Sequence, residues 1–124
     1  MRIFVLSVSM RADSNSDILA EAFSAGAAAV GNEVHKKSLR NLEIKPCNSC
    51  WACAKNGGHC VIDDDMKQLY AELDRCHFLL IATPLYYATF PAQFFAFVNR
   101  LYPYWTQKAY PKLDCAFFGV CADS

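Results

Sequence analysis

Short apolar runs alternate with amphipathic stretches along this chain, and the alternation predicts strands and helices in turn. Residues 3–8 and 78–82 are continuous apolar runs, which are typical of strands buried on both faces of a sheet. Residues 34–39 are more polar and predict a strand at a sheet edge, and residues 113–120 predict a fourth strand. Because β and α units alternate, we expect one parallel sheet with right-handed crossovers and helices on both faces.

Three amphipathic segments separate these runs and predict helices. The first follows residue 16 and ends at Gly31-Asn32, a common C-terminal signal. The second opens with aspartates at 63–65, which we interpret as cap and first-turn charges rather than a divalent-metal site. The third has Pro91 in its first turn. The positions expected to be buried are Ile18, Leu19, Ala22, Phe23, Ala27 and Val30, then Met66, Leu69, Tyr70 and Leu73, then Phe94, Phe95, Val98 and Leu101.

Size and charge narrow the possible functions. A chain of 124 residues is expected to form one domain over 1–124. The formal net charge is zero and no basic cluster occurs, so we expect no nucleic-acid partner. No apolar run reaches the roughly 18 residues of a membrane span, and the amino terminus leads directly into a strand, so we expect no membrane association and a cytoplasmic location. There, seven cysteines favour metal binding or redox chemistry over structural disulfides.

Four of those cysteines lie in one loop, residues 46–61. They are Cys47, Cys50, Cys53 and Cys60, with the spacing C-x2-C-x2-C-x6-C. Converging thiolates are the ligands of an iron–sulfur cluster or a zinc ion. The pair Gly57-Gly58 suits a tight return of the chain, because glycine adopts positive φ without steric cost. Cys76 and Cys115, in contrast, are expected to be buried apolar side chains.

Two further loops follow predicted strands, at the sheet edge where α/β folds bind ligands. The first carries hydroxyls and one arginine before a helix N-terminus, which together can form a phosphate site; its residues are Ser9, Arg11, Ser14, Asn15 and Ser16. The second, residues 83–89, carries aromatics and hydroxyls, and Tyr86 or Tyr87 could form the wall for a planar ring. The alternatives are an ordinary capped turn for the first loop and packing or partner contacts for the tyrosines.

The ordered motifs resemble the flavodoxin-like NAD(P)H-dependent FMN reductases and, among them, the iron–sulfur flavoproteins. That family carries a loop of the type G-S-P-R-x-x-S-N-T, similar to residues 8–16 here. It also carries a compact cysteine motif of this spacing, an acidic helix start like residues 63–66, and a loop S-P-x-Y-F/Y-G like residues 83–88. A helix resembling residues 91–100 follows, so the resemblance runs over the whole chain.

The resemblance implies a three-layer fold with a parallel sheet in the order 2-1-3-4. It also implies an FMN-dependent electron-transfer oxidoreductase, with a [4Fe-4S] cluster on Cys47, Cys50, Cys53 and Cys60. NAD(P)H would be an electron donor, and ferredoxin, NAD(P)H and a quinone all stay open as the redox partner. The implied FMN contacts are Ser9, Arg11, Ser14, Asn15 and Ser16 at the phosphate, Pro84, Leu85, Tyr86 and Tyr87 at the isoalloxazine ring, and Cys121 and Asp123 at its pyrimidine edge.

Three alternatives to this function stay open. The cysteines could be free thiols or a labile disulfide in a cluster-free NAD(P)H-dependent FMN reductase. They could instead bind structural zinc, with either Cys60 or His59 as the fourth ligand. Finally, the chain could be an inactive, shortened relative, because Val8, Met10, Ala88 and Ala122 stand where the family usually has glycine or proline.

The family's sheet has a fifth strand and a last helix that this sequence does not supply. Since that helix shares a face with the first helix, we expect Phe78, Leu80 and Phe117 or Phe118 to be exposed and the fourth strand to be an open edge. A covering partner is then needed, and we expect a homodimer or homotetramer. The candidate contacts are the aromatic residues Tyr102, Tyr104, Trp105 and Tyr110.

Overall fold

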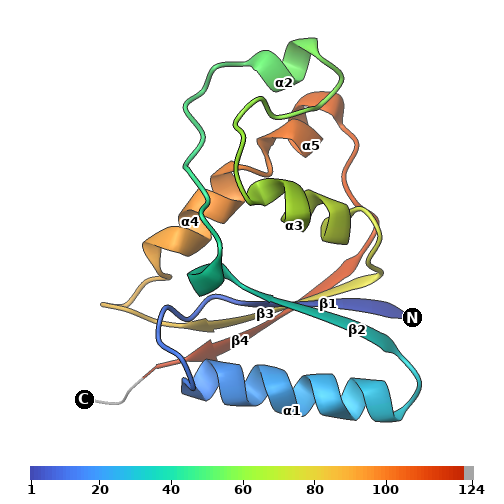
Figure 1. Ribbon diagram of the computed structural model, residues 1–124, viewed down its shortest axis with the longest axis vertical. Helices are drawn as coiled ribbons and strands as arrows, with labels where there is room; N and C mark the ends of the chain where they lie inside the picture. The colour runs from blue at the N-terminus through green and yellow to red at the C-terminus, as the bar shows by residue number, and fades with distance from the viewer. Residues whose placement is uncertain (122–124) are drawn as a thin grey trace.

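A four-stranded parallel sheet in the order β2-β1-β3-β4 organises the molecule (Figure 1). It is seen in a computed structural model that describes residues 1–121. The strands are β1 (Arg2–Ser7), β2 (Glu33–Ser38), β3 (Phe78–Pro84) and β4 (Asp114–Val120). This order confirms the prediction of an α/β fold with strand order 2-1-3-4.

Helices lie on both faces of the sheet. Helix α1 (Asn15–Ala29) covers one face, while α3 (Met66–Leu73) and α4 (Ala92–Asn99) lie on the other (Figure 1). Two short helices, α2 (Ala52–Lys55) and α5 (Tyr102–Gln107), contact each other beyond α3 and α4. A 3₁₀ turn, Leu39–Asn41, follows β2. Among residues 1–121, no helix has the length and apolarity needed to cross a membrane.

Strands β1 and β3 occupy the centre because their side chains are apolar on both faces. Phe4, Val5 and Leu6 are fully buried, and Val5 pairs in register with Leu80. Alternate residues therefore enter two separate cores, one under α1 and one under α3 and α4. Strand β2 is only partly buried, which confirms its prediction as a polar edge strand.

Helix α1 buries only part of the stripe that the sequence predicts, since Phe23 and Ala27 pack against the sheet but the other four positions do not. Ile18, Leu19 and Val30 are 59%, 43% and 78% exposed, and Ala22 is also exposed, whereas Ala20 is fully buried. The residues that face the sheet are Ser16, Ala20, Phe23 and Ala27, which recur at the helical spacing of four and three. Small residues such as Ala20 let the helix approach the sheet closely, while Ile18 and Leu19 remain on the side facing solvent.

Two other burial predictions are wrong in part. On α4, Phe94 is buried but Phe95 and Val98 are 44% and 40% exposed, because Phe97 takes the second inward position. Cys115 is exposed, since it lies on edge strand β4, whereas Cys76 is buried as expected.

The face under α1 is better covered than expected. Leu80 is fully buried, and Phe78 and Phe118 are half-buried against Phe23 of α1, with ring centroids 6.0 Å apart in both pairs. Phe117 is 52% exposed, as expected for one of the two phenylalanines, but it points to the opposite face, where it contacts Phe94. The long α1 reaches β3 and β4, and this reach explains the difference.

Candidate functional sites

A cleft of about 340 Å³ lies where β1, β3 and β4 end. This is the edge at which parallel α/β sheets bind ligands. Nine of the predicted FMN contacts line the cleft together with Val120; they are Ser9, Arg11, Ser14, Asn15, Ser16, Pro84, Leu85, Tyr86 and Cys121. The fold thus brings together three loops that are far apart in the sequence.

Two predicted contacts are not in this group. Tyr87 does not line the cleft, and its side chain is fully exposed at the tip of the loop after β3. Asp123 lies outside the described residues. Tyr86 is therefore the tyrosine placed to form the wall of the cleft.

The loop before α1 is held in place by its own hydroxyl groups. The Ser9 hydroxyl donates to the carbonyl of Arg11 at 2.9 Å and accepts from the Arg11 amide at 3.2 Å. Ser14 caps α1 by accepting from the amide of Asp17, and its hydroxyl lies 3.0 Å from that of Ser16. The amides of the first helical turn point out of the N-terminus, so the loop presents donors and partial positive charge to an anion.

A residue that the sequence pattern did not identify as functional also holds the loop before α1 in place through hydrogen bonds. Arg40, in the 3₁₀ turn after β2, donates from Nη1 to the carbonyls of Ser9 and Arg11 and to the Asp17 carboxylate, all at 3.1–3.2 Å. Burial raises the pKa of Asp17, but hydrogen bonds from Ser7, Arg40 and Ser14 outweigh it and hold the pKa below its usual value. The carboxylate stays ionised and ties β2 to the loop. A lone arginine after an edge strand gave no signal of this role.

The loop after β3 contains a tight hairpin turn. Tyr86 and Thr89 exchange backbone hydrogen bonds of 2.8 and 3.1 Å, and both central residues, Tyr87 and Ala88, have positive φ values of 49° and 60°. Mirror-image turns of this kind favour glycine or asparagine, because a Cβ atom crowds the left-handed conformation. Ala88 stands where the sequence comparison expected glycine, and the turn that positions Tyr86 is strained there.

We predict that Ala88→Gly raises the free energy of unfolding by about 1 kcal/mol, because glycine relieves this strain. Urea unfolding followed by circular dichroism measures the change. Ala25→Gly, on the exposed side of α1, is the matched control and should lower stability by about 1 kcal/mol. If both substitutions lower stability to the same extent, the turn is not strained.

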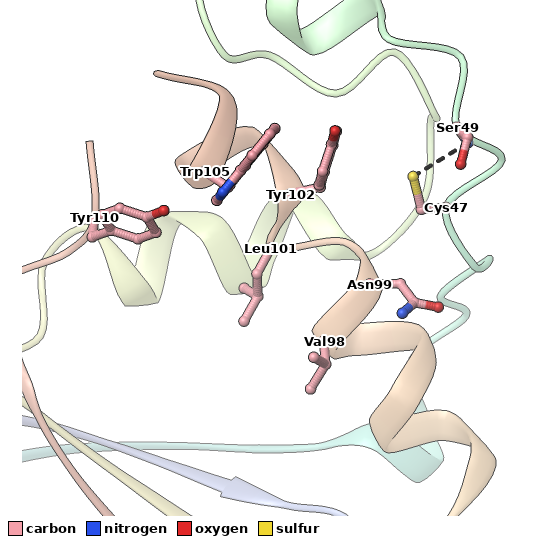
Figure 2. A pocket seen from close by; sticks show the side chains of 8 residues that line it. All are labelled: Cys47, Ser49, Val98, Asn99, Leu101, Tyr102, Trp105 and Tyr110. Atoms are coloured by element: carbon pink, nitrogen blue, oxygen red, sulfur yellow. Dashed lines mark hydrogen bonds between the residues drawn. The ribbon is translucent and has the colours of Figure 1, made fainter. Parts of the chain in front are cut away.

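The second candidate site is the cysteine loop, which leaves the sheet and packs against α5 through α2. Cys47, Cys50, Cys53 and Cys60 all line one small cavity, and Cys53 is buried at its base. The Ser49 amide donates to Cys47 Sγ at 3.4 Å, as Figure 2 shows. Within the described residues, no three metal-ligating side chains come close enough together to hold an ion. The four sulfurs thus share a cavity without converging on one point.

A buried ion pair closes the inner side of this cavity. Arg100, at the end of α4, is 1% exposed and lines the cavity together with the cysteines. It donates to the two carboxylate oxygens of Asp64 at 2.6 and 3.1 Å and to the carbonyl of Lys45 at 2.9 Å. Asp64 also accepts from the amides of Lys45 and Met66. The aspartate run is therefore structural, but not as the cap and first-turn charges that the sequence predicts: α3 begins at Met66, Asp65 at its N-cap makes no side-chain cap hydrogen bond, and Asp64 pairs with Arg100.

Tyr70 connects α3 to the same cluster of residues. Its hydroxyl donates to the carbonyl of Arg100. Burial, followed by the charge of the nearby Cys60, raises the pKa of Tyr70 above its usual value, so the phenol stays protonated and can donate.

An aromatic groove of about 590 Å³ lies on the outer side of Cys47 (Figure 2). Tyr102 and Trp105 stack with their ring centroids 5.1 Å apart, and Tyr110 lies beside them. Trp105 and Tyr110 are more than half exposed. The groove and the cysteine cavity share four residues in their walls, Cys47, Ser49, Asn99 and Tyr102. The cavity and the cleft at the strand ends have no described lining residue in common.

Comparison with known proteins gives concordant results. The model of the NADPH-dependent FMN reductase family matches residues 1–116. An iron–sulfur flavoprotein of Methanosarcina thermophila is 33% identical over 100 residues, which cover 81% of this chain and 52% of that protein. An iron–sulfur flavoprotein of Archaeoglobus fulgidus is 34% identical over 74 residues, or 60% of this chain and 33% of that protein. The chain thus spans about half or less of the length of these relatives.

Solved structures share the fold. An NAD(P)H:quinone oxidoreductase from Methanothermobacter marburgensis superposes with a TM-score of 0.78 at 16% identity, over 98% of this chain and 65% of that one. An azoreductase from Bacillus anthracis superposes with a TM-score of 0.62 at 16% identity, over 82% of this chain and 55% of that one. At such identities the likeness concerns architecture alone.

Proposed function

Since the chain belongs to the NADPH-dependent FMN reductase family, we propose that it is an FMN-dependent oxidoreductase that binds the flavin in the cleft at the strand ends. The observation that carries this proposal is the assembly of nine predicted contacts from three separate loops around one cleft. If the first loop were only a capped turn and the tyrosines only surface residues, there would be no reason for these residues to surround one cleft.

Different residues of the cleft would bind different parts of the flavin. Arg11 and the hydroxyls of Ser9, Ser14 and Ser16 would bind the phosphate together with the first amides of α1, because charge-assisted hydrogen bonds to a dianion are strong. Tyr86 and Leu85 would cover the ring and keep water from it. When bound, FMN accepts a hydride and can release its two electrons one at a time.

We further propose that the cysteine loop holds a [4Fe-4S] cluster. The donor set fits the cluster, since four thiol side chains line one cavity and the Ser49 amide already donates to a sulfur, as amides around such clusters do. Cys53 lies in the short helix α2 and the other three cysteines lie outside helices and strands, so binding of the cluster would require these segments to move until the four sulfurs converge. The four residues Cys47, Cys50, Cys53 and Cys60 would then position the cluster for electron exchange with a separate redox partner.

A comparison of two flavins tests the FMN proposal. Riboflavin has the isoalloxazine ring of FMN without the phosphate. Titration followed by flavin fluorescence should give a dissociation constant at least tenfold lower for FMN, because one charge-assisted hydrogen bond corresponds to about a factor of ten. Arg11→Ala should weaken the binding of FMN and leave that of riboflavin unchanged, whereas Arg75→Ala, at an exposed position in the turn after α3, should change neither. Equal affinities of the wild type for both flavins would contradict the proposed phosphate site.

A further inference from the structure

Arg100 has one donor that the folded chain does not satisfy. Its two terminal nitrogens donate to Asp64 and to the Lys45 carbonyl, but Nε is buried and has no hydrogen-bond partner among residues 1–121. The side chain is 1% exposed, so bulk water cannot compensate. A buried donor without a partner is costly, and its persistence points to a partner that binds at this place.

That donor belongs to a side chain in the wall of the cysteine cavity. Arg100 and all four cysteines line it. The other residues of this wall are neutral; they include Asn99, Tyr102 and Pro103. Arg100 is therefore the single charged side chain that the described residues place in the wall of this cavity.

A centre with four thiolate ligands is an anion. Four thiolates around a [4Fe-4S]²⁺ core or around Zn²⁺ carry a net charge of −2, and a one-electron reduction of the iron cluster adds a further negative charge. An anion of this kind in a small, partly enclosed cavity needs a compensating cation or hydrogen-bond donors.

We propose that Arg100 is the positioning residue for this anionic metal–thiolate centre, to which its buried Nε–H donates a hydrogen bond while Asp64 fixes the guanidinium from the other side. This inference rests on the proposed function of the cysteine loop. Arg100 stabilises the assembled centre and favours its more negative, reduced form. A centre without this donor releases its metal faster and is harder to reduce.

The test uses two variants of the full chain. Arg100→Lys keeps a positive charge but has no Nε. The pair Arg100→Gln with Asp64→Asn removes both charges and leaves no buried ion alone, so that the protein can fold. In each variant we expect metal release to a chelator to be about tenfold faster than in the wild type, as the loss of one hydrogen bond to a charged group implies. The midpoint potential of an iron centre, measured by a redox titration followed by electron paramagnetic resonance, should shift to more negative values.

Controls separate this inference from the proposed function. Arg75→Lys and Arg75→Gln, at an exposed position, should match the wild type in both measurements. A wild type that binds iron, with unchanged release rate and potential in both Arg100 variants, overturns the inference alone. If the wild-type protein holds zinc, the proposed iron–sulfur cluster is wrong. The rate of zinc release from the Arg100 variants, compared with the wild type, then tests the role of Arg100. A wild type without any metal overturns both.

Discussion

Asp64→Ala is expected to lower the free energy of unfolding by about 3–5 kcal/mol, because it leaves the buried charge of Arg100 without its partner. The carboxylate joins three segments, since it accepts from the amides of Lys45 and Met66 as well as from Arg100 of α4. Its removal leaves buried donors unsatisfied in each segment. The loss is read from urea unfolding followed by circular dichroism.

The neighbouring residue provides the matched control. Asp63 is 88% exposed and pairs with Lys67, four residues further along the chain, so Asp63→Ala should leave the unfolding curve close to that of the wild type. Asp64→Asn should fall between the two, because its amide oxygen can still accept from Met66 but no longer carries the compensating charge. Equal midpoints for Asp63→Ala and Asp64→Ala would show that the buried pair does not hold these segments together.

Cys53→Ala is expected to abolish iron binding in protein purified without oxygen. A cluster that loses one of its four thiolate ligands loses the closed ligand set that holds it. Cys53 is the most buried of the four cysteines, so solvent or an external thiol cannot easily replace its sulfur. Iron and acid-labile sulfide per chain, measured by colorimetric assay, report the result.

Cys76→Ala is the control for this substitution. Cys76, in the turn between α3 and β3, is also buried, but it does not line the cysteine cavity. Both variants remove one buried thiol, and only the first is expected to change the iron content. FMN binding should survive in both, because the flavin cleft has none of these residues in its wall. Iron retained at the wild-type level in Cys53→Ala would exclude this cysteine as a ligand.

The sequence was most informative where one physical requirement determines a pattern. Strands buried on both faces require apolar runs, and β1 and β3 show them at residues 3–6 and 78–82. The sequence was less informative for α1, where Ile18 and Leu19 are exposed and the small Ala20 faces the sheet. Hydrophobicity alone cannot identify the buried side of a helix that packs through small residues.

The candidate sites also contain some residues that the sequence pattern identifies and others that it does not. Loops such as residues 9–16 could be recognised because their hydroxyls and arginine lie close together in the sequence. Arg40 and Arg100 could not be recognised, because each acts on groups that lie more than twenty residues away in the sequence. Tyr87 was grouped with Tyr86 by adjacency, yet the turn directs it into solvent. Long-range polar pairs depend on tertiary structure and leave no local pattern.

The most direct test of the account is a count of cofactors in the wild-type protein purified without oxygen and supplied with FMN, iron and sulfide. The account predicts one FMN, four iron atoms and four sulfides per chain, with the absorption of a flavin and a brown iron–sulfur chromophore together. Protein that remains free of both flavin and iron under these conditions would contradict it.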